Sequence, residues 1–246
     1  MPPSFRALDL PPPFRLVALR EAGDSFAYAC VQAAKLGAGT LVFVGRFDLA
    51  EFAVVLEPEE PLVRARRSFY AGMTALADAL SALAPPETPI AIEWPDRLEI
   101  GRSLVGGGRL GWPQPADEHE RPDWLVFGAI IRLISTRSGQ AVLPPLSTSL
   151  ADEGFSDVGA ERLVEGVARH LMVAIDRWQE GEFAAIARDY VTRLRPERGV
   201  RRWIDASGNL QIERPGEPLT SLELRSALSA PSWLDRGCAP HRGHPQ

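Results

Sequence analysis

Residues 92–110, IEWPDRLEIGRSLVGGGRL, constrain the fold of this 246-residue chain more than any other segment. Apolar runs at 90–92 and 98–100 flank the turn Trp94-Pro95-Asp96, which is the pattern of a β-hairpin. Leu104-Val105 then begins a further strand. The glycines that follow match G-x-G-x-x-G, but the Trp-Pro-Gln-Pro stretch after them cannot open a helix. A dinucleotide-binding turn is therefore excluded.

The rest of the chain alternates strand and helix signals. Apolar, β-branched runs bounded by turn residues predict strands, and apolar positions at helical spacing predict helices. This alternation predicts an α+β fold. Strands are expected at 16–19, 40–44, 52–56, 124–133, 200–204 and 210–213, helices at 25–36, 61–83, 159–180, 183–194 and 221–228, and a mobile loop at 106–123.

The length suits one large core, or one core with a small appended module. Residues 1–13 are predicted to be an extended, proline-rich arm, 14–181 the main domain and 182–246 a small C-terminal α+β module. The module has few large apolar residues, so it cannot support an independent core. We expect it to dock on the main domain, with Trp203 or Trp233 as its anchor.

Composition and charge argue against several classes of protein. A net charge of −5 disfavours a nucleic-acid-binding protein, which usually has a basic surface. No apolar run approaches the roughly 20 residues that a membrane span needs, and the first residues contain no secretory signal. Cys30 and Cys238 indicate no disulfide framework, and the four histidines show no metal-site spacing. We expect a cytoplasmic protein without a metal site.

The hairpin segment resembles the central sheet motif of the biotin/lipoate protein ligase family. That family has a strand ending in Lys-Trp-Pro-Asn-Asp, a short turn, and a strand with the pattern Arg-Lys-Leu-Ala-Gly. Here the frame is Trp94-Pro95-Asp96, followed by RSLVG at 102–106. Glu93 and Ser103 stand at the positions of the two family lysines.

Other stretches extend the resemblance over residues 14–213. Asp24-Ser25 opens a helix that is followed by GAGTLVFVG, and RWQEGEFAAIARDY leads into RRWIDASGNLQIE near the C-terminus. The resemblance implies a class II aminoacyl-tRNA synthetase/biotin ligase-like fold, in which helices back a mixed, largely antiparallel sheet. The family's GRGRRG-type loop has no counterpart, because residues 44–51 contain a single arginine and two acids.

Members of this family activate biotin, lipoate or a related acyl group with ATP, and a lysine of a carrier domain attacks the acyl-adenylate. Fixed positive charge must offset the repulsion between a carboxylate and a polyphosphate. The resemblance thus implies ATP and biotin or lipoate as substrates and a biotinyl/lipoyl carrier domain as partner. The implied site residues are Ser103, at the lysine position, and Arg102 for catalysis, with Glu93, Trp94, Pro95, Asp96, Gly106, Gly107, Gly108 and Arg109 for ligand binding.

These residues also have purely structural interpretations. Ser103 can be a plain strand residue, Glu93 a solvated carboxylate, Trp94 a core side chain and the glycines a flexible loop. Two functions therefore stay open. One is a ligase that transfers biotin or a lipoyl-type group to a carrier lysine. The other is a degenerate binding protein that keeps the pocket without the adenylation chemistry.

Two other features have competing interpretations. Cys30 lies mid-helix among apolar residues, as an inert buried thiol does, although an acyl-thioester nucleophile is the alternative. The arginines between 193 and 202 can meet an acidic carrier domain or form a solvated face.

Overall fold

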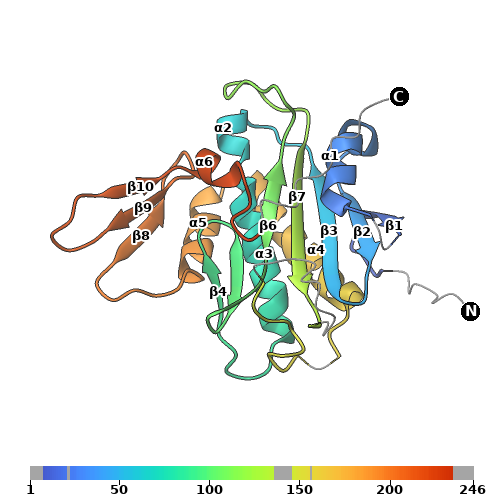
Figure 1. The fold of residues 1–246 in the computed structure, drawn as a ribbon. Coiled ribbons are helices and arrows are strands. Elements are labelled where there is room, and N and C mark those ends of the chain that lie inside the picture. Colours follow the sequence, from blue (N-terminus) through green and yellow to red (C-terminus); the bar gives the residue numbers. More distant parts are fainter. Residues whose placement is uncertain (1–7, 21–22, 136–145, 156, 235–246) are drawn as a thin grey trace, which may run out of the picture.

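The computed structural model describes residues 8–20, 23–135, 146–155 and 157–234. A seven-stranded sheet forms its centre, with helices on both faces (Figure 1). β1 and β2 are parallel, and every other pair of neighbours in this sheet is antiparallel. The strand order is β1 (Arg15–Leu19), β2 (Thr40–Gly45), β3 (Leu49–Leu56), β7 (Leu125–Arg132), β6 (Ser103–Gly111), β5 (Arg97–Ile100), β4 (Ile90–Glu93). The α+β prediction, with its mixed and largely antiparallel sheet, is confirmed.

One face of the sheet packs against α1 (Ser25–Leu36). The Asp24 carboxylate caps this helix by accepting a hydrogen bond from the backbone N–H of Ala27 at 2.9 Å, and Gly37, at φ 71°, ends it. Ala29 and Ala33 of the helix are buried against Val42 and Val126 of the sheet. We call this side of the sheet the α1 face.

The opposite face carries the main core and is covered by α3 (Ser68–Leu83) and α4 (Ala160–Gln179). Successive residues of a strand point to opposite faces, so Phe43, Phe52 and Phe127 point to this side while their neighbours point to α1. The two long helices pack against each other as well as on the sheet. Among the described residues, no helix is long and apolar enough to cross a membrane.

The predicted loop at 106–123 is wrong in its first part, because residues 106–111 belong to β6 in the middle of the sheet. Clustered glycines usually mark loops, but here they allow close packing. A side chain at Gly106 would overlap the carbonyl oxygen of Ile130 in the neighbouring strand. A Cβ at Gly108 would lie 2.5 Å from Sδ of Met73 in α3.

Two predicted helices also differ from the observed elements. The long helix expected from Pro61 is divided into α2 (Leu62–Ala65) and α3, with Arg66 and Arg67 between them. A last helix is expected at 221–228. The first part of that range belongs to strand β10 (Thr220–Leu222), and only α6 (Leu224–Leu228) is helical.

The C-terminal part of the chain adds a three-stranded antiparallel sheet of β8 (Arg201–Ile204), β9 (Leu210–Glu213) and β10. It follows α5 (Phe183–Thr192), which packs on α3 and α4. The tip of the β8–β9 hairpin docks at the start of α3, where the Tyr70 hydroxyl donates a hydrogen bond to the carbonyl oxygen of Gly208 at 2.5 Å. Of the two tryptophans proposed as anchors, Trp233 is fully buried and Trp203 is half-buried.

The glycines of β6 give a first prediction. Gly106→Ala should lower the free energy of unfolding by about 3 kcal/mol, because the added methyl group overlaps backbone that cannot move independently. Gly166→Ala in α4 is the matched control, since its Cβ would meet Ala79 at an ordinary 3.4 Å. That change should be neutral or stabilising by up to about 1 kcal/mol. Urea denaturation measures both, and equal effects would contradict this account of the strand.

Truncation after Leu194 tests the docking of the C-terminal part. Leu210, Ile212, Leu224 and Leu228 belong to the main core, so their removal exposes apolar surface of that core. We expect insoluble protein or a melting temperature lower by about 10 °C, which corresponds to roughly 3 kcal/mol in a domain of this size. A truncated protein with unchanged thermal stability would mean that the C-terminal part is only loosely tethered.

Candidate functional site

The antiparallel register brings distant residues into rows across the α1 face of the sheet. In one row, Glu51 of β3 lies beside Ile130 of β7, then Gly107 of β6 and Arg97 of β5. In the next row toward α1, Gly128 of β7 lies beside Arg109 of β6. The α1 helix covers one half of this face, and the first row forms the floor of the other half.

Gly107 is the place where the floor lacks a side chain. An added Cβ would lie 2.5 Å from Nε1 of Trp233 and would overlap the carbonyl oxygen of Asp96. Trp233 comes from the far C-terminal end of the described chain and is fully buried. It packs in a small apolar cluster with Leu49, Leu104 and Ile130. A side chain of the same protein thus approaches the Gly-rich strand closely at the position that the resemblance implies for ligand binding.

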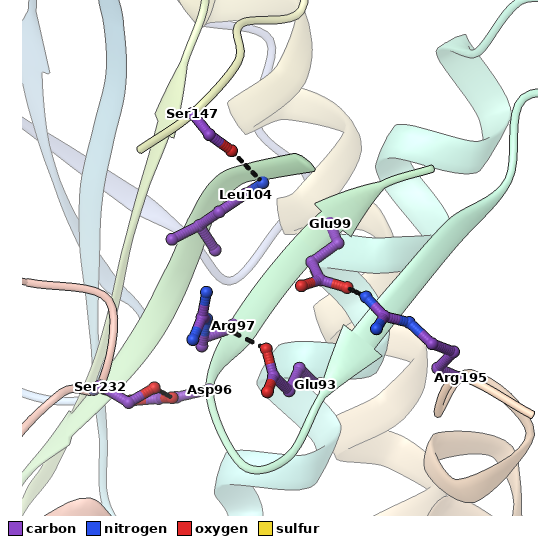
Figure 2. Close-up of polar contacts among 8 residues, drawn as sticks. All are labelled: Glu93, Asp96, Arg97, Glu99, Leu104, Ser147, Arg195 and Ser232. Atoms are coloured by element: carbon purple, nitrogen blue, oxygen red, sulfur yellow. Dashed lines mark hydrogen bonds and ion pairs between the residues drawn. The ribbon is translucent and has the colours of Figure 1, made fainter. Parts of the chain in front are cut away.

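Asp96 fixes the segment that carries Trp233. The carboxylate is 1% exposed and accepts two hydrogen bonds from Ser232, one from the backbone N–H at 2.8 Å and one from the hydroxyl at 2.5 Å (Figure 2). Burial raises the pKa of this carboxyl, and the hydrogen bonds from Ser232 oppose the rise. The carbonyl oxygen of Asp96 also accepts the N–H of Gly108 at 2.9 Å, which ties the hairpin turn to β6.

The start of α1 meets the same face. Glu51, 5% exposed, accepts the backbone N–H of Ser25 at 2.8 Å, and burial raises the pKa of its carboxyl. Arg109 donates a hydrogen bond to Asp24 at 2.9 Å, and its guanidinium carbon lies 4.2 Å from the centre of the Phe26 ring. Two carboxylates and one guanidinium thus lie around the first turn of the helix.

The other predicted site residues lie apart from this floor. Ser103 begins β6 opposite Ile100, and Arg102 is exposed in the turn before it. Glu93 is half-exposed and pairs with Arg97 at 3.2 Å across the hairpin end (Figure 2). Trp94 packs against the main core on the other face, and its indole N–H donates to the Tyr70 hydroxyl at 3.2 Å. Pro95 lies in the same turn, where its carbonyl oxygen accepts the hydroxyl hydrogen of Tyr190.

The structure therefore brings together Asp96, Gly107 and Arg109 of the predicted residues, while Gly106 and Gly108 face the main core. Sequence reasoning missed Glu51, Arg97 and Trp233. A signal exists for Glu51, because it is an acid inside the apolar run LAEFAVVL. Trp233 has no comparable signal, since only the tertiary fold places it on β6.

A cavity of about 500 Å³ opens on the other side of the sheet, between α4 and the segment after β3. Phe14, Leu171 and other apolar side chains line it, and its polar lining includes Glu57, Glu59 and Asp176. None of the residues that line it is an arginine or a lysine. Its negative charge disfavours the small carboxylate that the resemblance implies.

Cys30 and the C-terminal arginines are the two further features with competing sequence interpretations. Burial raises the pKa of the Cys30 thiol to about 12, so at neutral pH the group is not a thiolate nucleophile.

In the described part of the chain, no group of three or more His, Cys, Asp or Glu residues could hold a metal ion. The C-terminal arginines mostly form ion pairs, such as those of Arg193 with Asp78, Arg195 with Glu99 and Arg202 with Glu197.

The raised pKa of Glu51 predicts how stability depends on pH. The folded protein holds this proton at pH values where the unfolded chain has released it, so stability falls as pH rises from the ordinary glutamate pKa toward the raised one. Glu51→Gln keeps an acceptor for Ser25 and removes the buried charge. We expect it to raise the melting temperature at pH 7.5, with an advantage that shrinks as the pH approaches about 4.5.

Glu59→Gln, at an exposed position, is the control for that series and should change little at either pH. Thermal denaturation followed by circular dichroism at both pH values measures the effect. An advantage of Glu51→Gln that does not depend on pH would contradict the assignment to a buried charge.

Solved structures share this arrangement of strands and helices. A biotin protein ligase-like protein of unknown function from Silicibacter sp. TM1040 matches with a TM-score of 0.80 and 29% identity, over 91% of this chain and 100% of that one. The biotin protein ligase of Aquifex aeolicus matches with a TM-score of 0.67 and 15% identity, over 85% and 95%. That of Leishmania major in complex with biotin matches with a TM-score of 0.54 and 14% identity, over 87% and 99%.

No curated protein matches the chain. The model of the biotin/lipoate A/B protein ligase family matches residues 10–192, which include all seven strands of the central sheet and both of its helical layers. The chain therefore belongs to the biotin/lipoate A/B protein ligase family.

Proposed function

We propose that this protein binds a small carboxylate on the α1 face of its sheet without joining it to a nucleotide. The observation that carries the proposal is the balance of charge around this face. Its described charged groups include the arginines Arg46, Arg97, Arg109 and Arg132 and the acids Asp24, Asp48, Glu51, Glu93 and Asp96. The arginines named here do not outnumber the acids.

A triphosphate does not fit these residues. It needs backbone N–H groups and several cations to offset its own negative charge. Arg46 lies in the connection between β2 and β3, where the family carries its arginine-rich loop, and it forms a two-fold hydrogen bond with Asp48. Ser103 adds no charge at the position of the family lysine. An ATP molecule would therefore meet carboxylates before it met a free positive charge.

A monocarboxylate requires much less. Arg97 lies in the same row as Gly107, and its partner Glu93 is half-exposed. Exposed pairs of this kind contribute about 0–1 kcal/mol, so a ligand carboxylate can replace Glu93 at little cost. The guanidinium can then donate hydrogen bonds to both oxygens of the ligand carboxylate, in the two-fold geometry that arginine favours. Arg97 is the residue we assign to carboxylate binding.

The second candidate is ligase activity, with a carrier-domain lysine as acceptor and ATP as co-substrate in the cytoplasm. The family match over residues 10–192 favours it. The Aquifex aeolicus ligase, whose structure includes biotin and ATP, has the same fold at 14% identity. Activity of this kind would require cations to be rearranged around the face or supplied by the carrier domain.

Calorimetry and pyrophosphate exchange distinguish the two candidates. We expect at least one of biotin, lipoate and octanoate to bind, and none to support exchange of pyrophosphate into ATP. Arg97→Gln should weaken that binding at least tenfold, because the ligand carboxylate loses its cation. Arg102→Gln, on the exposed turn beyond the site, is the matched control and should bind as the native protein does.

Ser103→Lys restores the family residue and gives a further arm of that experiment. We expect no exchange activity from the single change, because the arginine-rich loop is also absent. Exchange by the native protein would establish the ligase candidate instead. Absence of binding by all three acids would contradict both candidates.

A further inference from the structure

The segment of residues 229–234 leaves α6 and crosses β6 on the α1 face, as the red chain in front of that strand shows in Figure 1. Three hydrogen bonds attach it to the sheet. Two join Ser232 to the Asp96 carboxylate, and the third runs from the Trp233 indole N–H to the carbonyl oxygen of Gly108 at 2.8 Å. We call this segment the C-terminal latch.

The Trp233 indole is held in surroundings of the kind that bind a small ring. It lies on the residue without a side chain in the floor, Gly107, and against the apolar side chains of Leu49, Leu104, Ile130 and Leu146. Its single N–H donor satisfies a backbone carbonyl of the floor. An aromatic ring buried on apolar walls with one directed hydrogen bond is also how a small-molecule site holds a ring.

We propose that Trp233 is an internal occupant of the candidate site, and that a ligand enters when the C-terminal latch swings away. The ligand class follows from the occupant: a flat ring of about indole size with one N–H donor directed to Gly108. The claim that a ligand takes the place of Trp233 rests on the proposed function. The claim that the latch opens does not depend on it.

The latch can leave without breaking the sheet. It contributes no strand or helix, since α6 ends at Leu228 and β6 is already hydrogen-bonded to β5 on one side and to β7 on the other. The floor at Gly107 therefore persists when Trp233 is gone. The carboxylate of Asp96, freed from Ser232, then lies at the edge of the opened site.

Occupation by Trp233 reduces the affinity for any ligand that needs the same place. The apparent dissociation constant is the intrinsic one divided by the fraction of molecules in which the latch is open. If the latch is open in one molecule out of a hundred, the apparent dissociation constant is a hundred times the intrinsic one. A variant without the indole should bind the ligand with the intrinsic constant.

Hydrogen exchange of the Trp233 indole N–H tests the opening without any ligand. In protein labelled with ¹⁵N-tryptophan, Trp233→Phe identifies its resonance among the six tryptophans. We expect this N–H to exchange at least tenfold faster than the slowest backbone amides of β6 and β7, because the latch opens locally. Exchange at the rate of those amides would make Trp233 a fixed part of the core and overturn the proposal.

Binding of free indole tests the site that the latch vacates. Trp233→Ala leaves a space of matching shape, so this variant should bind indole at least tenfold more tightly than the native protein. Trp203→Ala, which removes the same ring from the half-buried position on β8, is the matched control and should not gain affinity. Equal affinities of the native protein and Trp233→Ala would overturn the proposal. If Trp233→Ala does not fold, Trp233→Phe is the substitute, because it keeps an aromatic ring but loses the hydrogen bond to Gly108 and part of the packing. Its Ser232 amide should exchange faster than that of the native protein, and an unchanged rate would count against the latch.

The two proposals fail separately. Indole carries no carboxylate, and indole-3-propionate carries one, so tighter binding of the second to Trp233→Ala reports the contribution of Arg97. If the Trp233 N–H exchanges fast and Trp233→Ala binds indole but none of the carboxylates, the latch stands and the proposed function falls. If octanoate binds the native protein and the Trp233 N–H exchanges as slowly as the backbone amides of β6 and β7, the proposed function stands and the latch falls.

Discussion

The close approach of β6 to the layers on both of its sides is the constraint on which the rest of the structure depends. Three consecutive glycines let the backbone of this strand contact Met73 of α3 on one face and Trp233 on the other. Any side chain there would push apart either the strands or a covering layer. Because β6 also pairs with β5 and β7, its position fixes the hairpin turn that holds Asp96. The core and the candidate site therefore share one strand.

Most of the fold could be predicted from local patterns, because the strands and long helices bury their apolar residues at the period that the sequence displays. The main error, at residues 106–111, has a physical cause. Local sequence patterns treat clustered glycines as a sign of a flexible loop. Here glycine is required by close contacts with Ile130 and Met73, which lie far away in the sequence. The break at Arg66 and Arg67 and the short β10 likewise depend on tertiary contacts, such as the ion pair of Arg66 with Glu118.

The site was less predictable than the fold. The resemblance grouped Asp96, Gly107 and Arg109, which share one region of the structure, with Trp94, which faces the main core. Arg97 and Glu51 enter the site only through strand register, which couples residues on four different strands into a row. The assignment of roles to Ser103 and Arg102 stays a prediction, because nothing in their position at the start of β6 shows contact with a ligand.

The C-terminal part of the chain connects these observations. Its hairpin docks on α3 through Tyr70 and Gly208, and its apolar residues extend the main core, so the point from which the latch departs is held close to the sheet. A tethered side chain at that distance has a high effective concentration at Gly107, whatever the concentration of protein. Three hydrogen bonds and one ring then suffice to cover the floor, although the latch adds nothing to the sheet. A free ligand has to exceed that effective concentration, so the docking of the module would set the ligand concentration at which the site responds.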